Sequence, residues 1–165
     1  MKKNRAMLIG SIGAGKSTMT NALLGRRVEA VKTQTLTYYD WIVDTPGEYA
    51  ENPMYYRSIM ATCLEVTHVI YIQDATRSTC IFPPGFATGI PKLPIGVISK
   101  ADSPQADVDR AVEQLKKVMA KGPLVICSAY TGQGIEEIRH LVLQDSLEDM
   151  RECSRLFSPD LISFI

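Results

Sequence analysis

Residues 10–17 read GSIGAGKS and directly follow the apolar run 6–9, AMLI. This string matches G-x-x-x-x-G-K-[ST], in which glycines let backbone N–H groups converge on phosphate oxygens. The motif needs a strand before it and a helix after it. Both are predicted, because an apolar strand pattern precedes the loop and a helical pattern over 17–24 ends at Gly25. The sequence therefore predicts a phosphate-binding loop, and an ordinary glycine-rich turn is the alternative.

Each part of the loop has a chemical role in that interpretation. The ammonium of Lys16 reaches the β and γ phosphates, and the hydroxyl of Ser17 is a ligand for Mg²⁺. The helix that begins at this point directs its partially positive N-terminus toward the same anion.

Composition limits the other function classes. The 165 residues suit one domain, and 18 basic residues balance 18 acidic ones, so no global field favours nucleic acid or an anionic membrane. The four cysteines form no C-x-x-C pair, which argues against a zinc site or disulfide framework and fits a reducing cytosol. No apolar run approaches the roughly 18 residues that span a bilayer. We expect a cytoplasmic protein without a membrane span.

A second motif follows the next predicted strands. Residues 33–39 and 41–43 form a predicted hairpin, and Asp44-Thr45-Pro46-Gly47 comes directly after it. At the carboxyl edge of a sheet, Asp44 can hold Mg²⁺ through water and Gly47 can offer its N–H to a γ-phosphate. An ordinary turn is the alternative, because D-x-x-G strings often form one.

The remaining chain alternates strands with helices. Predicted strands are 66–73, 95–98 and 124–127, and predicted helices are 54–64, a segment that Ser103 caps and that runs to 119, and 135–142. This order predicts an α/β three-layer sandwich, with a mainly parallel sheet, helices on both faces and the ligand at the carboxyl edge. The apolar loop 79–94 is predicted to pack on the surface, with a partner-binding loop as the alternative.

The C-terminal residues are divided from the main domain. Residues 1–145 form the predicted nucleotide-binding domain, and 146–165 a C-terminal extension. Leu147, Met150, Leu156 and Phe157 are expected to extend the last helix as far as Pro159. The apolar residues 161–165 are predicted to pack back on the domain, and docking to a partner protein is the alternative.

Residues 99–102, SKAD, indicate which base is bound. The string differs by one residue from N-K-x-D, which reads guanine in P-loop GTPases. In such a site Asp102 accepts hydrogen bonds from guanine N1–H and the 2-amino group, whereas adenine leaves the carboxylate without donors at a cost of roughly 1–3 kcal/mol. Lys100 lays its stem along the base, and Ala129, in the pair Ser128-Ala129, offers its N–H to guanine O6. The alternative is a surface pair, Lys100 and Asp102, ahead of a helix.

The strings GSIGAGKS, DTPGE, SKAD and SA, in this order, resemble the translation-factor-related class of P-loop small GTPases. More narrowly, KTQ at 32–34, DTPGEY at 44–49 and FPPG at 82–85 are similar to the EutP/PduV family of ethanolamine- and propanediol-utilisation proteins. The resemblance covers about residues 2–143. It implies a bacterial cytosolic protein associated with microcompartments, with shell or enzyme proteins as partners. It also brings in a second activity, because family members are described as acetate kinases that use ATP.

The resemblance assigns roles residue by residue. It places Mg²⁺ on Ser17, Asp44 and Thr33, with Thr35 in reserve for the switch threonine, and it completes the triphosphate sensor with Gly47. The residues that it assigns to phosphates are Gly10, Gly13, Ala14, Gly15, Lys16, Ser17 and Thr18. Those that it assigns to the base are Ser99, Lys100, Asp102, Ser128 and Ala129.

Glu48 stands where many relatives have a glutamine that orients the attacking water. Its charge repels the γ-phosphate, so we expect slow intrinsic hydrolysis. The leading hypothesis is a GTP-binding switch, whose segments 31–39 and 47–57 become ordered around the γ-phosphate. No arginine is identified as an internal finger for hydrolysis, and Arg57 and Arg77 are expected to be solvated. The first alternative is an ATP-dependent acetate kinase, for which the sequence identifies no acceptor pocket. A structural adaptor with an inert nucleotide pocket is the second alternative.

Overall fold

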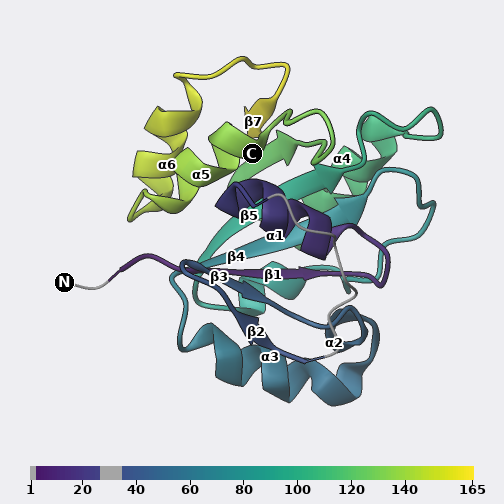
Figure 1. Cartoon of the computed structure of the whole chain (residues 1–165), viewed down its shortest axis with the longest axis vertical. Coiled ribbons are helices and arrows are strands. Elements are labelled where there is room, and N and C mark those ends of the chain that lie inside the picture. The colour runs from purple at the N-terminus through teal and green to yellow at the C-terminus, as the bar shows by residue number, and fades with distance from the viewer. Residues whose placement is uncertain (1–2, 27–34) are drawn as a thin grey trace.

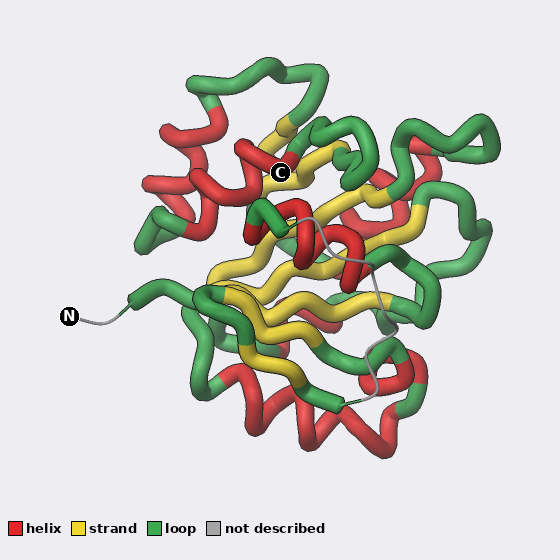
Figure 2. Tube along the Cα trace, in the orientation of Figure 1, coloured by secondary structure: helices red, strands yellow, loops and turns green. Residues whose placement is uncertain are grey.

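One sheet with the strand order β2-β3-β1-β4-β5-β6-β7 runs through the computed structural model, which describes residues 3–26 and 35–165 (Figures 1 and 2). The inner strands pair in parallel, and the edge strands β2 and β7 pair antiparallel to their neighbours. The strands are β1 Ala6–Gly10, β2 Thr37–Tyr38, β3 Ile42–Asp44, β4 His68–Asp74, β5 Leu93–Ser99, β6 Pro123–Ile126 and β7 Ile162–Phe164.

Helices cover both faces of this sheet. One face packs against α1, α5 and α6, and the other against α2, α3 and α4. The helices are α1 Lys16–Leu24, α2 Glu48–Glu51, α3 Tyr56–Cys63, α4 Val108–Val118, α5 Ile135–Val142 and α6 Leu147–Ser154, with 3-10 turns η1 Pro53–Tyr55 and η2 Phe86–Gly89. The prediction of an α/β three-layer sandwich with a mainly parallel sheet is confirmed.

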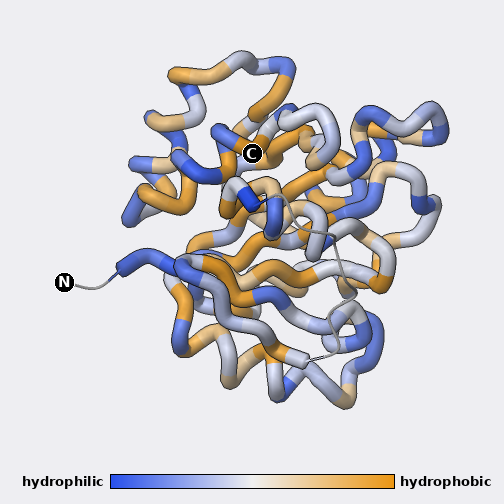
Figure 3. Tube along the Cα trace, in the orientation of Figure 1, coloured by the Kyte–Doolittle hydropathy of each residue, from blue (hydrophilic) through white to orange (hydrophobic). Residues whose placement is uncertain are grey.

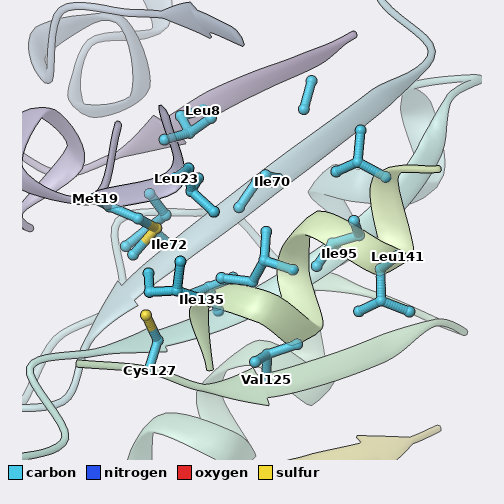
Figure 4. Packing of buried hydrophobic residues seen from close by; sticks show 14 of the residues in the cluster. Leu8, Met19, Leu23, Ile70, Ile72, Ile95, Val125, Cys127, Ile135 and Leu141 are labelled. Carbon is cyan, nitrogen blue, oxygen red and sulfur yellow. The ribbon is translucent and has the colours of Figure 1, made fainter. Parts of the chain in front are cut away.

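The sheet separates two hydrophobic cores, and strand β1 contributes to both. Ala6 and Leu8 point into the core beneath α1 and α5, whereas Met7 and Ile9 point into the core beneath α3 and α4. This is the two-residue alternation of a strand that is buried on both faces. Figure 4 shows the first core, where Leu8 and Ile70 of the sheet meet Leu23 of α1. Figure 3 shows the apolar strands along the middle of the molecule.

Helix α4 begins later than predicted. Ser103 does not cap it; the cap is Asp107, whose Oδ1 accepts a hydrogen bond from the backbone N–H of Arg110 at 3.0 Å. The Asp107 N–H is already bound to the Ala75 carbonyl at 2.8 Å, which fixes the chain there. Residues 103–106 form a turn instead, in which Ser103 Oγ accepts from the Gln105 N–H. The prediction of a helix from Ser103 is therefore wrong by about one turn.

The loop 79–94 packs against the sheet, as predicted. Phe82 and Ile90 are buried, and the rings of Phe82 and Phe86 lie edge-on to Tyr71 of β4 with centroids 5.7 and 6.3 Å away. Its last two residues belong to β5, which starts at Leu93.

The extension of the last helix is not observed. Helix α5 ends at Val142, where the side-chain amide of Asn4 donates to the Val142 carbonyl at 2.9 Å. A new helix, α6, then begins behind Ser146, whose Oγ accepts from the Asp149 N–H at 3.0 Å. The prediction failed because Ser146 adopts an extended backbone and interrupts the helical path. Strand β7 then pairs with β6 and buries Ile162.

Within the described residues, no helix combines the length and apolar character that crossing a bilayer requires.

Candidate nucleotide site

The loop 10–17 joins β1 to α1 and wraps around its own lysine. Gly13 and Gly15 have φ values of 80° and 94°, in the left-handed region that glycine adopts at little cost. Lys16 is 7 % exposed, and its Nζ donates to the carbonyls of Gly10 at 3.1 Å and Ser11 at 3.0 Å. At Gly10 a Cβ would lie 3.1 Å from the Ile72 carbonyl oxygen. The loop therefore has the close backbone packing that a phosphate cradle requires.

The two residues predicted to share Mg²⁺ lie together. Ser17 Oγ donates to Asp44 Oδ2 at 3.1 Å, and Asp44 sits at the end of β3, opposite Leu8 of β1. Thr45 fixes this strand end, since its Oγ1 donates to the Leu8 carbonyl at 2.7 Å. Hydroxyl and carboxylate oxygens are the donors that Mg²⁺ prefers, and it takes few protein ligands when phosphates supply the rest. The residues present thus fit the ion.

The switch threonine is not placed by the structure. Thr33 lies outside the described residues, and Thr35, the reserve, is exposed.

Gly47 lies directly against the phosphate loop. A Cβ on Gly47 would come within 2.7 Å of the backbone N and Cα of Ile12, which is closer than atoms can approach. Helix α2 starts immediately afterwards with Glu48, whose side chain is exposed. Figure 1 shows α2 beside the end of β1.

A contact not predicted from the sequence joins α2 to the same loop. Glu51, the last residue of α2, accepts a hydrogen bond at Oε1 from the backbone N–H of Ile12 at 3.1 Å. The same oxygen lies 3.5 Å from Nη1 of Arg77, in the loop after β4. No spacing rule connects residues 12, 51 and 77, so the sequence carried no signal for this cluster.

The SKAD segment is bonded to the phosphate loop. Ser99 Oγ donates to the Ala14 carbonyl at 2.8 Å, and Lys100 Nζ donates to the Gly13 carbonyl at 2.6 Å. The alternative of a surface pair between Lys100 and Asp102 is not what the structure shows, because Lys100 pairs with Asp74 at 2.9 Å. Asp102 is exposed.

Asp74 is a site residue that the sequence reasoning missed. Burial by itself would raise the pKa of its carboxyl, but hydrogen bonds from Thr76 and Lys100 outweigh burial, so the pKa lies below its usual value. Thr76 donates to Asp74 Oδ1 with both its hydroxyl, at 2.6 Å, and its N–H, at 2.8 Å. The position of Asp74 in the sequence could have indicated this role, because Asp74 ends β4 just as Asp44 ends β3.

Four of the five predicted base-binding residues line one small pocket, and Ser128 does not line it. Ser128 is fully buried, and its N–H donates to the Gln133 carbonyl at 2.9 Å, which holds Ala129 at the pocket wall. Tyr130, which the sequence reasoning also missed, is 82 % exposed at the rim, and its place next to Ser128-Ala129 was the available signal. Thr18, predicted to bind phosphate, also faces this pocket. The lining residues are Ala14, Gly15, Thr18, Met19, Ser99, Lys100, Asp102, Ala129 and Tyr130.

Comparison with known families decides the classification. The PduV-EutP family, described as "Ethanolamine utilisation - propanediol utilisation", matches residues 2–144. The chain belongs to this family. The resemblance inferred from the KTQ, DTPGEY and FPPG strings is therefore confirmed, and the protein is linked to ethanolamine and propanediol utilisation.

Two PduV-EutP relatives show the extent of the similarity. "Probable acetate kinase EutP" of Escherichia coli (strain K12) is 35% identical over 136 residues, covering 81% of this chain and 86% of the relative. "Propanediol utilization protein PduV" of Citrobacter freundii is 29% identical over 134 residues, covering 81% of this chain and 89% of the relative.

A solved structure supports the fold. The Era protein of Aquifex aeolicus, crystallised as a point variant bound to GDP.AlF4-, superposes with a TM-score of 0.60 at 20% identity. The match covers 88% of this chain and 57% of the Era chain. This PduV-EutP protein therefore has the fold of a P-loop GTPase.

Proposed function

We propose that this PduV-EutP protein is a GTP-binding switch with slow intrinsic hydrolysis. The observation that carries the proposal is the direct bonding of the SKAD segment to the phosphate loop, through Ser99 to Ala14 and Lys100 to Gly13. These bonds hold the groups that would read the base at a fixed place relative to the groups that would bind phosphate. A nucleotide is the ligand that needs both.

Base selectivity is the first prediction. Asp102 would accept hydrogen bonds from guanine N1–H and its 2-amino group, so GTP should bind with Mg²⁺ at least tenfold more tightly than ATP, about 1.4 kcal/mol. In Asp102→Asn, GTP affinity should fall and XTP affinity rise, because an amide can donate to the xanthine 2-carbonyl. Isothermal titration calorimetry with the three nucleotides measures this. ATP binding as tight as GTP binding would contradict the guanine assignment.

Glu48 provides the second prediction. Its exposed carboxylate, at the first residue of α2, repels the γ-phosphate and the charge that develops in hydrolysis. Glu48→Gln should therefore raise single-turnover GTP hydrolysis, by roughly tenfold if the amide orients water. Unchanged turnover would argue against any role for this side chain.

The Mg²⁺ ion belongs to the same proposal. Ser17 and Asp44 would hold it, with Thr33 as the proposed third ligand. When bound, the ion would neutralise phosphate charge. Lys16 would bind the β and γ phosphates, and Gly47 would offer its N–H to the γ-phosphate.

Phosphoryl transfer from ATP to a carboxylate such as acetate is the second candidate. It draws on the printed name of the Escherichia coli relative and on the contact of Arg77 and Ile12 with a carboxylate at the phosphate loop. Formation of acetyl phosphate from acetate and ATP tests it.

A structural adaptor would keep binding its partner after Lys16→Ala and Asp44→Ala. The proposed setting is the bacterial cytoplasm, with microcompartment shell or enzyme proteins as partners.

A further inference from the structure

We propose that Arg77 and the backbone N–H of Ile12 form a binding site for a small carboxylate at the phosphate loop, and that the Glu51 side chain occupies this site in the structure. The inference rests on the second candidate function, phosphoryl transfer to a carboxylate, and names its acceptor site. An acetate-sized monocarboxylate is the expected ligand.

The geometry is that of a carboxylate held by two donors. The N–H of Ile12 and the guanidinium of Arg77 come from two different loops and meet at one oxygen, Oε1 of Glu51, at 3.1 and 3.5 Å. A charged donor combined with a backbone N–H binds a carboxylate more strongly than two neutral donors do. Because Ile12 lies between Gly10 and Gly13, a ligand in this position touches the phosphate loop itself.

Glu51 is held weakly enough to be exchanged. Its side chain is 29 % exposed and that of Arg77 is 39 % exposed, and ion pairs this accessible to water contribute little to stability. Rotation of one glutamate side chain is sufficient to open the site, so the backbone of α2 need not unfold. Packing of Gly47 on Ile12 would keep α2 in place during the exchange.

A carboxylate bound here is suited to attack a γ-phosphoryl group. One carboxylate oxygen forms a bond to the γ-phosphorus as the bond from that phosphorus to the β–γ bridging oxygen breaks. The electron pair of the broken bond stays on the nucleoside diphosphate, and the acceptor gains the phosphoryl group as an acyl phosphate. No proton is transferred, because the carboxylate enters as an anion. Arg77 offsets the repulsion between the two anions as they approach.

The test measures acetate binding to the full chain loaded with nucleotide and Mg²⁺, by calorimetry and by the NMR line width of [¹³C]acetate. Arg77→Gln should weaken acetate binding by roughly tenfold or more, because the charged donor is lost. Glu51→Ala should tighten it severalfold, because the internal competitor is gone. Glu51→Gln should have an intermediate effect, because its amide oxygen can still accept from Ile12 but carries no charge. Arg57→Gln, on the exposed surface of α3, is the matched control and should change nothing.

Three results would overturn the proposal. The first is acetate affinity that Arg77→Gln leaves unchanged. The second is that Glu51→Ala weakens nucleotide binding or stability without raising the affinity for acetate. Glu51 would then only connect α2 to the phosphate loop. The third is no acetate binding in either wild type or Glu51→Ala.

Failure of the proposed function gives a different pattern. If wild type binds neither GTP nor ATP, the nucleotide site itself is wrong. If nucleotide and acetate both bind with the predicted Arg77 dependence but no acetyl phosphate forms, the carboxylate site is supported and the kinase activity is not.

Discussion

Lys100 adopts a backbone conformation that is rare for residues other than glycine. Its φ of 59° is the one positive value at a non-glycine residue among residues 3–26 and 35–165. The left-handed region costs such a residue roughly 1 kcal/mol. The contacts of Nζ with the Gly13 carbonyl and Asp74 offset that cost and place the lysine stem beside the pocket proposed for the base. Strain of this kind is typical of functional sites.

Asp74→Asn tests this arrangement through pH. Because the folded-state pKa of Asp74 is lowered, its stabilisation is fully present above the unfolded value near 4 and is lost as pH falls through the folded value. The variant should lose about 1–2 kcal/mol of unfolding free energy at pH 7, since Lys100 is partly solvated. Urea unfolding of both proteins from pH 7 to 3 measures the difference. If the difference in unfolding free energy between wild type and variant does not become smaller below pH 4, the ion pair is not the source of that difference.

The sequence predicted the strand-end motifs at this scale and missed the side-chain pairs between them. The proximity of Asp44 and Ser17 could be predicted from the sequence, because the carboxyl ends of parallel strands lie at one edge of the sheet. Asp74 with Lys100 and Glu51 with Arg77 depend on how loops of irregular length return to that edge. No sequence pattern specifies how these loops fold back, so the contacts could not be predicted from the sequence alone.

At the scale of elements, α2 is fixed by close packing. The missing side chain at Gly47 lets the first turn of α2 touch the backbone of Ile12. Gly47→Ala should move α2 away and cost roughly 1–3 kcal/mol of stability. It should also lower the preference for GTP over GDP about tenfold, because the proposed contact of the Gly47 N–H with the γ-phosphate would be lost. Thermal unfolding and paired titrations with GTP and GDP measure both effects. Gly89→Ala is the control, since a Cβ there meets nothing within 4 Å.

Element boundaries were predictable where burial is continuous. Strands β4, β5 and β6 lie within about two residues of their predicted positions, since their apolar runs fill the sheet. Helix α4 was misplaced because Ser103 and Asp107 are both good caps, and a long-range bond from Asp107 to Ala75 decided between them. Helix α2 was not predicted at all, because four residues carry no helical period.

At the scale of the whole molecule, β7 completes the sheet beyond β6. Ile162 is 4 % exposed beneath this edge, next to α6. Ile162→Ala should lower the unfolding free energy by about 2 kcal/mol or more, as expected for a truncated core residue. Ser163→Ala, at the neighbouring exposed position, should have little effect. Chemical denaturation measures both. Equal stability of the two variants would mean that this strand contributes nothing to the fold, which would favour a docking role for residues 161–165.

The overall architecture was the most predictable level, because the alternation of strands and helices leaves few ways to cover both faces of a parallel sheet. The addition of β7 was not predictable in detail, since its three residues could pair with either sheet edge or with another protein.

The single ammonium group of Lys100 joins Gly13 of the phosphate loop to Asp74 at the end of β4. The two halves of a nucleotide should then bind interdependently. Guanosine alone and pyrophosphate alone would each occupy only one side of this bridge. Their separate binding free energies should sum to less than that of GDP, and in Lys100→Ala this excess should shrink.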